Sequence, residues 1–374
     1  MTEPVILEGA GVRLRPFAAQ DAPRVREACN DPLITHFMAQ MPSPYTEADA
    51  DWWIGEGAPA AWRKGGAAWA VVDPDTGDLL GGAGMGQVLP ERAQAEVGYW
   101  VAPWARRRGV ATAATRAITD WAFAERGVAR MELVTAPGNA ASQRVALAAG
   151  FTREGVRRGG ATLRDGSRAD YIVFTRLATD PPGPVAPGLP DFPGGKLTDG
   201  AVRLRRLGPG DAEALFALSQ LPEVRRSNIG GPSTLDGVRE RCALAESEWL
   251  AGTRAVCAIV DAATGEFAGD IGLFYQEPFL RQAILGYSLR PEFRGRGLAS
   301  RAARLFSDWA MADAGVIRVV AGTFPYNDAS RRVLERAGFE REGYLAARLP
   351  GPDGTRVDDI QYVRIAPHRK SPDQ

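Results

Sequence analysis

The feature that most constrains the fold of this chain is an internal repeat. Leu7 to Phe17 reads LEGAGVRLRPF, and Leu197 to Leu207 reads LTDGAVRLRRL. From Asp73 to Asp170 the first copy aligns with the second at a constant offset of 188 residues and without a gap. Identical residues at this offset include Asp73 and Asp261, Gly81 and Gly269, Gly98-Tyr99 and Gly286-Tyr287, Trp121 and Trp309, Asn139 and Asn327, Gly150-Phe151 and Gly338-Phe339, and Asp170 and Asp358. Such a register predicts two copies of one fold in a single chain.

The length of the chain agrees with two domains. Domains commonly take roughly 100 to 200 residues, and the chain has 374. Between the copies, Pro181 to Gly195 reads PPGPVAPGLPDFPGG, which is too rich in proline and glycine to continue a helix or to pair as a central strand. We therefore expect a first domain over 1–178, a semi-extended linker over 179–196 and a second domain over 197–370.

Apolar periodicity and turn signals predict the elements of the first copy. We expect strands over 12–15, 67–72, 79–88, 96–101 and 130–135, helices over 21–29, 47–62, 110–125 and 142–149, and a final hairpin that turns at Asp165-Gly166. Interleaved strands and helices predict an α/β fold of the mixed α+β kind. Each domain is then a central mixed, mostly antiparallel sheet flanked by helices.

Composition and charge exclude several classes of function. Lys plus Arg and Asp plus Glu both number 45, so the chain has no overall field that would attract nucleic acid. Cys29, Cys242 and Cys257 are far apart, and His36 and His368 are the only histidines, which disfavours a metal site, a Ser-His-Asp triad and a disulfide framework. The amino terminus lacks the order of a signal peptide, and no apolar run approaches the about 20 residues of a membrane span. We expect a cytoplasmic protein with neither nucleic acid nor a membrane as partner.

The strongest chemical motif lies between a predicted strand and a predicted helix in each copy. It reads Arg106-Arg107-Arg108-Gly109-Val110-Ala111 in the first copy and Arg294-Gly295-Arg296-Gly297-Leu298-Ala299 in the second. Glycine allows the backbone to approach a ligand closely, and the free amides and dipole of a first helical turn suit a pyrophosphate group. Arginines add charge-assisted hydrogen bonds. A single copy is also compatible with an arginine-rich surface loop, but two copies in one register favour a phosphate site.

With these motifs the chain resembles the GNAT family of acyl-CoA N-acyltransferases. The family's pyrophosphate loop, Arg/Gln-x-x-Gly-x-Gly/Ala, follows a splayed strand, and EVGYWVAPWARRRGVAT is similar to this unit in the branch that acetylates amino termini of ribosomal proteins. NAASQRVALAAGF and NDASRRVLERAGF resemble the family's later Asn-x-x-Ser helix, and RADYIVFTRL and RVDDIQYVRI its last strand. The resemblance covers nearly all of both halves outside the linker. It implies acetyl-CoA, or another acyl-CoA, as donor and no metal.

The resemblance also implies which residues bind the donor. The loop backbone from Arg107 to Ala111 would hold the pyrophosphate, Tyr99, Trp100 and Val101 would pair with pantetheine, and Asn139 would touch the thiol arm. The matching positions of the second half are Leu289, the loop from Arg294 to Ala299, Asn327 and Ser330.

The catalytic residues are less determined by the sequence. Amine acylation needs a neutral amine and therefore a base. Glu96 lies where family members often carry a catalytic glutamate. The alternative interpretation of Glu96 is a surface carboxylate at a strand edge. Ser142 occupies the position proposed to protonate the departing thiolate. The tyrosine that many family members place a few residues later is replaced by Ala146 and Leu334.

The second half differs at the position of the base. Ile284 stands where the first half has Glu96, so the second half either uses another carboxylate, such as Asp270 or Glu277, or does not catalyse. Five arginines near the hairpin could attract an acidic acceptor, but we interpret them as a solvated face: Arg153, Arg157, Arg158, Arg164 and Arg168.

The resulting hypothesis is direct acyl transfer to a primary amine in a ternary complex. The acceptor could be an amine-bearing small molecule, a peptide or a protein amino terminus. The first alternative is a non-catalytic acyl-CoA-binding or interaction module, at least in the second half, and the other is that both halves turn over different acceptors. The tandem halves could form an intramolecular pseudo-dimer, and the chain would then be a monomer, or it could form a homodimer.

Overall fold

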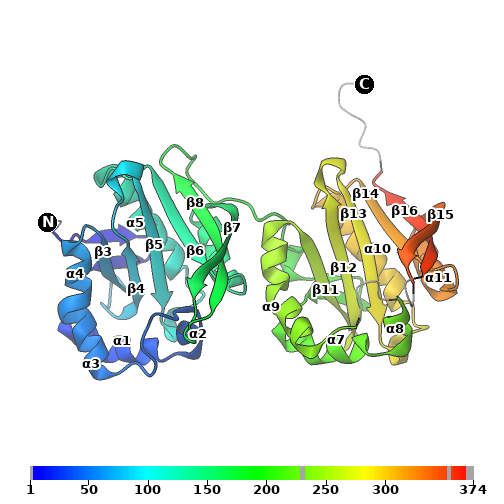
Figure 1. The fold of residues 1–374 in the computed structure, drawn as a ribbon, viewed down its shortest axis with the longest axis horizontal. Helices are drawn as coiled ribbons and strands as arrows, with labels where there is room; N and C mark the ends of the chain where they lie inside the picture. The colour runs from blue at the N-terminus through cyan, green and yellow to red at the C-terminus, as the bar shows by residue number, and fades with distance from the viewer. Residues whose placement is uncertain (1–2, 228–231, 352–354, 368–374) are drawn as a thin grey trace. The chain divides into compact units, whose positions relative to one another are not determined.

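The chain folds into two compact units of the same architecture. The structure, a computed structural model, describes residues 3–227, 232–351 and 355–367. Unit 1 is Met1–Ala186 and unit 2 is Pro187–Gln374 (Figure 1). The division falls inside the segment that the sequence predicts to be a linker.

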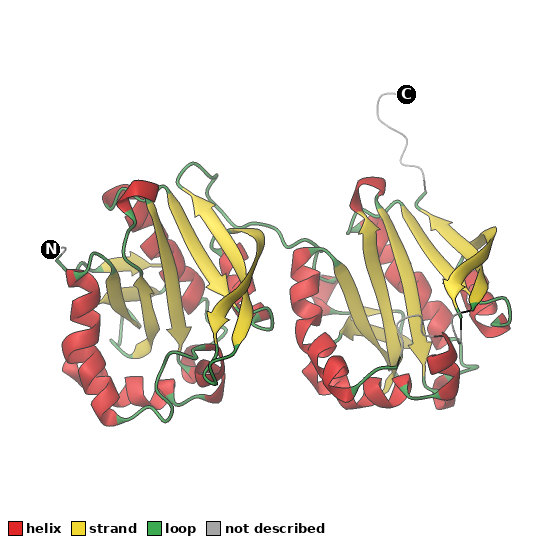
Figure 2. Ribbon diagram, in the orientation of Figure 1, coloured by secondary structure: helices red, strands yellow, loops and turns green. Residues whose placement is uncertain are grey.

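Unit 1 contains eight strands in one sheet, with helices on both sides (Figure 2). Its strands are β1 (Leu7–Gly9), β2 (Val12–Arg15), β3 (Ala67–Val72), β4 (Leu79–Met85), β5 (Gln94–Val101), β6 (Arg130–Thr135), β7 (Thr152–Thr162) and β8 (Arg168–Leu177). Its helices are α1 (Ala22–Cys29), α2 (Pro32–Phe37), α3 (Glu47–Trp52), α4 (Ala58–Arg63), α5 (Val110–Glu125) and α6 (Ala140–Ala148).

Unit 2 repeats this order with a second eight-stranded sheet. Its strands are β9 (Leu197–Thr198), β10 (Val202–Arg206), β11 (Arg254–Asp261), β12 (Phe267–Glu277), β13 (Gln282–Leu289), β14 (Arg318–Thr323), β15 (Glu340–Pro350) and β16 (Arg356–Ile365). Its helices are α7 (Ala212–Ser219), α8 (Pro222–Ser227), α9 (Leu235–Ala251), α10 (Leu298–Ala312) and α11 (Asp328–Arg336).

The two sheets have the same topology. The strand order is β1-β2-β3-β4-β5-β6-β8-β7 in unit 1, and unit 2 has its equivalent. All neighbouring strands are antiparallel except β5 with β6, and β13 with β14, which are parallel. The prediction of two mixed, mostly antiparallel sheets flanked by helices is confirmed.

The buried side chains of β3 show how both faces of the sheet are covered. All six residues of β3 are buried, which is expected for a strand with helices on both sides. Trp69 packs edge-on against Trp121 of α5, with ring centroids 5.4 Å apart. Ala70 and Val72 point to the other face, where they join Val25 of α1 in a buried cluster. The alternation of side chains along β3 thus connects two cores.

The structure differs from the predicted elements in several places; for example, β4 ends at Met85 rather than at residue 88, and β5 begins at Gln94 rather than at residue 96. The helix expected over 47–62 is interrupted by a π-helical turn, Trp53–Gly57. Pro59 explains the interruption, because it has no amide hydrogen for the regular helical bond to residue 55. The short α2 and β1 were not predicted. The helix α6 begins at Ala140 rather than at residue 142, because the side chain of Asn139 caps it by accepting a hydrogen bond from the amide of Ser142.

Part of the predicted linker belongs to the core of unit 2. Leu189 and Phe192 are buried there, and the Phe192 ring packs edge-on against Trp249 and Trp309 at centroid distances of 5.0 and 4.9 Å. Trp249 also donates a hydrogen bond of 3.2 Å to the carbonyl of Pro190. The prolines prevent regular structure in this segment, but they do not prevent its apolar side chains from packing.

We predict that Phe192→Ala lowers the free energy of unfolding of unit 2 by about 3–5 kcal/mol, because it leaves a cavity among three aromatic rings. Urea unfolding of the full chain measures this loss. Lys196→Ala, an exposed position four residues later, is the control and should change the free energy by less than about 0.5 kcal/mol. A loss of similar size in both variants would contradict the packing described for Phe192.

Candidate functional site

The candidate site of unit 1 lies where two parallel strands separate. β5 and β6 pair at Gln94 with Arg130, Ala95 with Met131 and Glu96 with Glu132, and their described pairing ends there. Beyond Glu96, β5 continues to pair with β4 on its other side. One edge of β5 is therefore left without a neighbouring strand, and unpaired strand edges readily accept an extended ligand.

Two carboxylates stand at this point of separation. Glu96 and Glu132 are partners in the last pair of the parallel ladder. The side chain of Glu96 reaches solvent, but the protein atoms around its carboxyl group remove part of its hydration. This burial raises the pKa of Glu96; the charge of Arg157 lowers it, and that of Glu132 raises it further. A carboxyl group with a raised pKa is a stronger proton acceptor.

Glu132 is held in its charged form by two arginines. It is only 7% exposed and accepts hydrogen bonds from Arg130 at 2.7 Å and from Arg157 at 2.9 Å. Burial alone would raise the pKa of Glu132, but these two partners outweigh it and hold the pKa below its usual range. The interpretation of Arg157 as part of a solvated face is incomplete, because its guanidinium group reaches the candidate site from β7.

A second polar pair links β5 to α6. The hydroxyl groups of Tyr99 and Ser142 lie 2.9 Å apart, at hydrogen-bond distance. Burial raises the pKa of Tyr99, so the phenol stays protonated and able to donate. Asn139, which is expected to touch a ligand, caps α6 through its Oδ1. The sequence analysis did not predict that the phenol of Tyr99 contacts Ser142. The sequence does contain a hint of this contact, because both residues recur at the same offset, as Tyr287 and Ser330.

The arginine-glycine loop has the backbone geometry of an anion site. Arg107 and Gly109 have φ angles of 62° and 78°, in the left-handed region that glycine adopts most easily. No side chain caps the amino terminus of α5, so its first amides remain available. A Cβ atom built on Gly109 would meet no protein atom within 4 Å. The loop therefore opens onto space, with the positive end of the helix dipole behind it.

The outer arginines of this loop are held by carboxylates. The guanidinium group of Arg106 pairs with Asp31, which also caps α2. Arg108 pairs with Asp73 at 3.2 Å. These pairs connect the loop to α2 and to the end of β3, and they fix its position. The backbone amides, rather than these two side chains, are the groups left to bind an anion.

Unit 2 reproduces the loop and the hydroxyl pair. Gly295 and Gly297 have φ angles of 75° and 78°, and α10 likewise begins without a side-chain cap. The hydroxyl groups of Tyr287 and Ser330 lie 2.8 Å apart. Burial raises the pKa of Tyr287 to about 12. Asn327 caps α11 as Asn139 caps α6.

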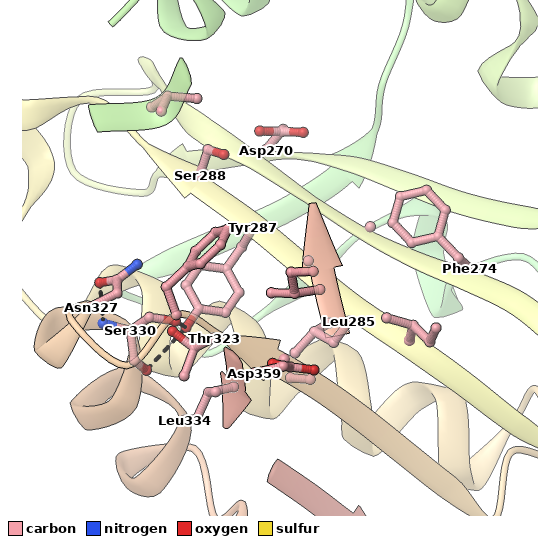
Figure 3. Close-up of a pocket in the computed structure, with 18 of the residues that line it drawn as sticks. Asp270, Phe274, Leu285, Tyr287, Ser288, Thr323, Asn327, Ser330, Leu334 and Asp359 are labelled. Carbon is pink, nitrogen blue, oxygen red and sulfur yellow. Dashed lines mark hydrogen bonds between the residues drawn. The ribbon is translucent and has the colours of Figure 1, made fainter. Parts of the chain in front are cut away.

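In unit 2 the side chains at the point where β13 and β14 separate are apolar instead of acidic. Ile284 and Val320 form its last parallel pair, where unit 1 has Glu96 and Glu132. A cavity of about 480 Å³ adjoins this pair, and Tyr287, Asn327 and Ser330 line it as well (Figure 3). Of the two alternative bases, Asp270 lines this cavity, whereas the side chain of Glu277 lies outside the described residues.

Asp270 marks a further difference between the units. It is 9% exposed and pairs with Arg241 at 3.0 Å; burial raises its pKa, against the charge of Arg241. Gly82 occupies the matching position of unit 1, and there a Cβ atom would lie 2.6 Å from Nε1 of Trp100. The indole of Trp100 thus covers the place that stays open in unit 2, where Ser288 faces Asp270.

The structure brings most of the predicted site residues together in each unit. Glu96, Tyr99 and Ser142 lie on or beside the free edge of β5, and the loop follows at the end of that strand. Trp100 contributes its backbone to the strand, since its side chain packs against the core beside α1. Glu132 and Arg157, which were not predicted, complete the acidic end of the site. In the part of the chain that the structure describes, no helix is long and apolar enough to cross a membrane.

Comparison with known protein families gives two matches in this chain. A family model described as the acetyltransferase (GNAT) domain matches residues 12–152 and, separately, residues 201–340. Each match extends from the second strand of its unit to the start of the final hairpin. Together they include both arginine-glycine loops and the strands before them.

Individual relatives match shorter segments. YjcK of Bacillus subtilis, described as a probable N-acetyltransferase, is 37% identical over 86 residues, which are 23% of this chain and 48% of YjcK. The chain therefore spans about half the length of that relative. The uncharacterized N-acetyltransferase YoaA of the same organism is 28% identical over 44% of this chain and 93% of its own length. Among solved structures, Mycobacterium smegmatis RimJ in complex with CoA-disulfide is 25% identical over 49% of this chain and 90% of its own, with a TM-score of 0.43.

Proposed function

Because the chain belongs to the GNAT acetyltransferase family, we propose that both units bind an acyl-coenzyme A donor and that unit 1 transfers the acyl group to a primary amine. The transfer is a direct attack within a ternary complex. One observation carries this proposal: Glu96 stands at the last residue pair before β5 and β6 separate. A proton acceptor thus lies beside a strand edge inside the sheet that an extended ligand can join.

The donor site follows from the free edge and the loop. The amides from Arg107 to Ala111 would hold the pyrophosphate, because α5 is uncapped and Gly109 opens onto empty space. The backbone from Tyr99 to Val101 would pair with the pantetheine arm, which places the thioester near Ser142. When bound, the coenzyme supplies an activated acyl group and a thiol leaving group. An amide near Trp100 or Val101 would polarise the thioester carbonyl.

The two polar pairs would handle the protons. The carboxylate of Glu96 takes a proton from the acceptor's ammonium group, so that the neutral amine can attack. Its raised pKa suits this role, and Glu132, held charged by Arg130 and Arg157, helps to keep it raised. Ser142 donates a proton to the departing thiolate and regains one from Tyr99 through their 2.9 Å contact, while the second proton lost by the amine nitrogen restores Tyr99. The tyrosine that family members place on the later helix is thus replaced here by one from β5.

The acceptor belongs to the class of primary amines: an amine-bearing small molecule, a peptide or a protein amino terminus. The position of Glu96 argues against a purely binding role for unit 1, since a carboxylate with a raised pKa is costly to keep at a site that only holds a ligand.

We predict that Glu96→Gln lowers kcat of unit 1 about 10²–10⁴-fold near neutral pH and leaves the affinity for acetyl-CoA unchanged, because an amide cannot take the proton. Release of free thiol measures kcat in a chain that also carries Gly297→Trp, so that only unit 1 can bind the donor. Glu91→Gln, at an exposed turn position before β5, serves as the control. An undiminished kcat in the Glu96 variant would exclude Glu96 as the base.

The pH dependence tests the same carboxylate independently. Glu96 acts in its deprotonated form, so kcat/KM falls as the pH drops through its pKa, which lies above the usual value. Arg157→Gln removes the charge that lowers this pKa, and the acid limb of the pH profile should therefore move to higher pH. The limb should stay in place in Arg158→Gln, whose exposed side chain is one residue along β7. A limb that stays in place, or moves to lower pH, in Arg157→Gln would contradict this assignment.

A further inference from the structure

The cavity of unit 2 contains a buried carboxylate that the proposed function does not use. Asp359 of β16 lines the cavity and is 1% exposed. Figure 3 shows its carboxyl group in the same pocket as Tyr287, Ser330 and Leu285. Unit 1 has no equivalent, since Tyr171 stands at the matching position. The sequence reasoning considered Asp270 and Glu277 as carboxylates of unit 2 and missed this one.

Only one oxygen of Asp359 is fully engaged. Oδ2 accepts a hydrogen bond of 2.9 Å from Arg348, while Oδ1 is buried and makes no hydrogen bond of normal geometry. The Thr323 amide lies close enough to the carboxyl group to lower its pKa. A buried oxygen without a good partner is costly unless a ligand supplies the donor. Burial also raises the pKa of Asp359, and the charge of Arg348 offsets this only in part. The group is therefore prepared to accept both a hydrogen bond and a proton.

An irregularity in the pairing of β15 with β16 positions Arg348, and Arg348 holds the carboxylate of Asp359 in place. The pairing of β15 with β16 is irregular between Leu345 and Leu349, and Ala347 there has a φ angle of 52°. Such a bulge redirects side chains, and Arg348 reaches Asp359 from this segment. Unit 1 has a similar irregularity, but Gly160 stands at the position of Arg348. The arginine and the aspartate thus occur together in unit 2 and are both missing from unit 1.

The rest of the wall has an apolar side, and Arg241, Asp270 and Arg348 line other parts of it. Leu215 and Leu218 of α7, Val224 of α8, Phe274 of β12, and Ile284 and Leu285 of β13 line the cavity. A ligand can place an apolar substituent against this side of the cavity and direct one hydrogen-bond donor to Oδ1. A primary amine with an apolar substituent, in its ammonium form, meets both conditions.

We propose that this cavity is a second acceptor site, in which Oδ1 of Asp359 binds the ammonium group of an apolar primary amine and takes its proton. This inference rests on the proposed function, which supplies the acyl-CoA donor. The amine nitrogen then forms a bond to the thioester carbon, and the carbon–sulfur bond breaks. The thiolate takes a proton from Ser330, which regains one through Tyr287 from the nitrogen's second proton, while the proton on Asp359 passes to solvent. In unit 2 Asp359 thus takes the role that Glu96 has in unit 1, from a different strand.

The test uses the full chain with Glu96→Gln, so that thiol release from acetyl-CoA reports unit 2. We expect phenethylamine to be turned over faster than the polar amine glycinamide. Adding Asp359→Asn should lower kcat about 100-fold without changing the affinity for acetyl-CoA. Asp236→Asn is the control, because this carboxylate lies on the surface of α9 with its side chain 94% exposed; its kcat should stay within threefold.

A second variant covers the case in which Asp359→Asn, which leaves Arg348 without its partner, does not fold. Val224→Trp, at a half-buried position of the cavity wall, should raise KM for phenethylamine at least tenfold and leave KM for acetyl-CoA unchanged. Acetyl-CoA binding that depends on Gly297, together with no turnover of either amine by the Glu96→Gln chain, would overturn this inference alone. Turnover that survives Asp359→Asn would do the same. Failure of the intact chain to bind acetyl-CoA would overturn the proposed function and this inference with it.

Discussion

The candidate site of unit 1 depends on the short parallel pairing of β5 with β6. All other neighbouring strands of this sheet pair antiparallel. β5 and β6 pair in parallel over only three residues and then separate. Beyond that point β6 is held by β8 and β5 by β4, so neither strand can close the gap. The separation leaves a free strand edge and places Glu96 and Glu132 at its end. The loop at the other end of β5 then supplies the uncapped helix that can receive a phosphate.

The two units show how one scaffold can keep the arginine-glycine loop and the hydroxyl pair and change the side chains beside them. The loop glycines, the hydroxyl pair and the asparagine cap are nearly the same in both units. The differences gather on the other side of the separation. There, two glutamates of unit 1 are replaced by Ile284 and Val320, and the indole of Trp100 is replaced by the small side chain of Ser288. Unit 2 has a cavity there, and its charged lining residues, Arg241, Asp270, Arg348 and Asp359, come from four different elements.

The fold could be predicted from the sequence because the repeat doubles every signal. A single turn glycine or arginine-glycine loop is weak evidence for a structure. The same feature at the same offset in both halves is strong evidence for it. The helix caps and the left-handed backbone of Gly109 and Gly297 follow from local chemistry. Even the unusual backbone of Arg107 has a signal in the repeat, since Gly295 stands at its position.

The partners of Glu96 could not be predicted in the same way. Glu132 faces it only because of the parallel register, and Arg157 reaches both from a strand much later in the chain. The role of Asp359 could not be predicted for a similar reason. Its contact with Arg348 depends on an irregularity in β15, and no glycine, proline or asparagine between Leu345 and Leu349 indicates that irregularity. Local sequence patterns describe single elements well, whereas these sites arise from the register between elements.

If each unit binds an acyl-CoA donor at its arginine-glycine loop, as we propose, calorimetric titration of acetyl-CoA will count two sites. The titration compares the intact chain with Gly109→Trp and Gly297→Trp, whose new side chains point into space that is free of protein atoms within 4 Å of the Cβ position. Gly109→Ala and Gly297→Ala impose the same backbone strain, about 1–2 kcal/mol, without the bulk. Donor binding by both units predicts two sites in the intact chain, one lost in each tryptophan variant and neither lost in the alanine variants. Binding that survives both tryptophan variants, or no binding by the intact chain, would contradict it.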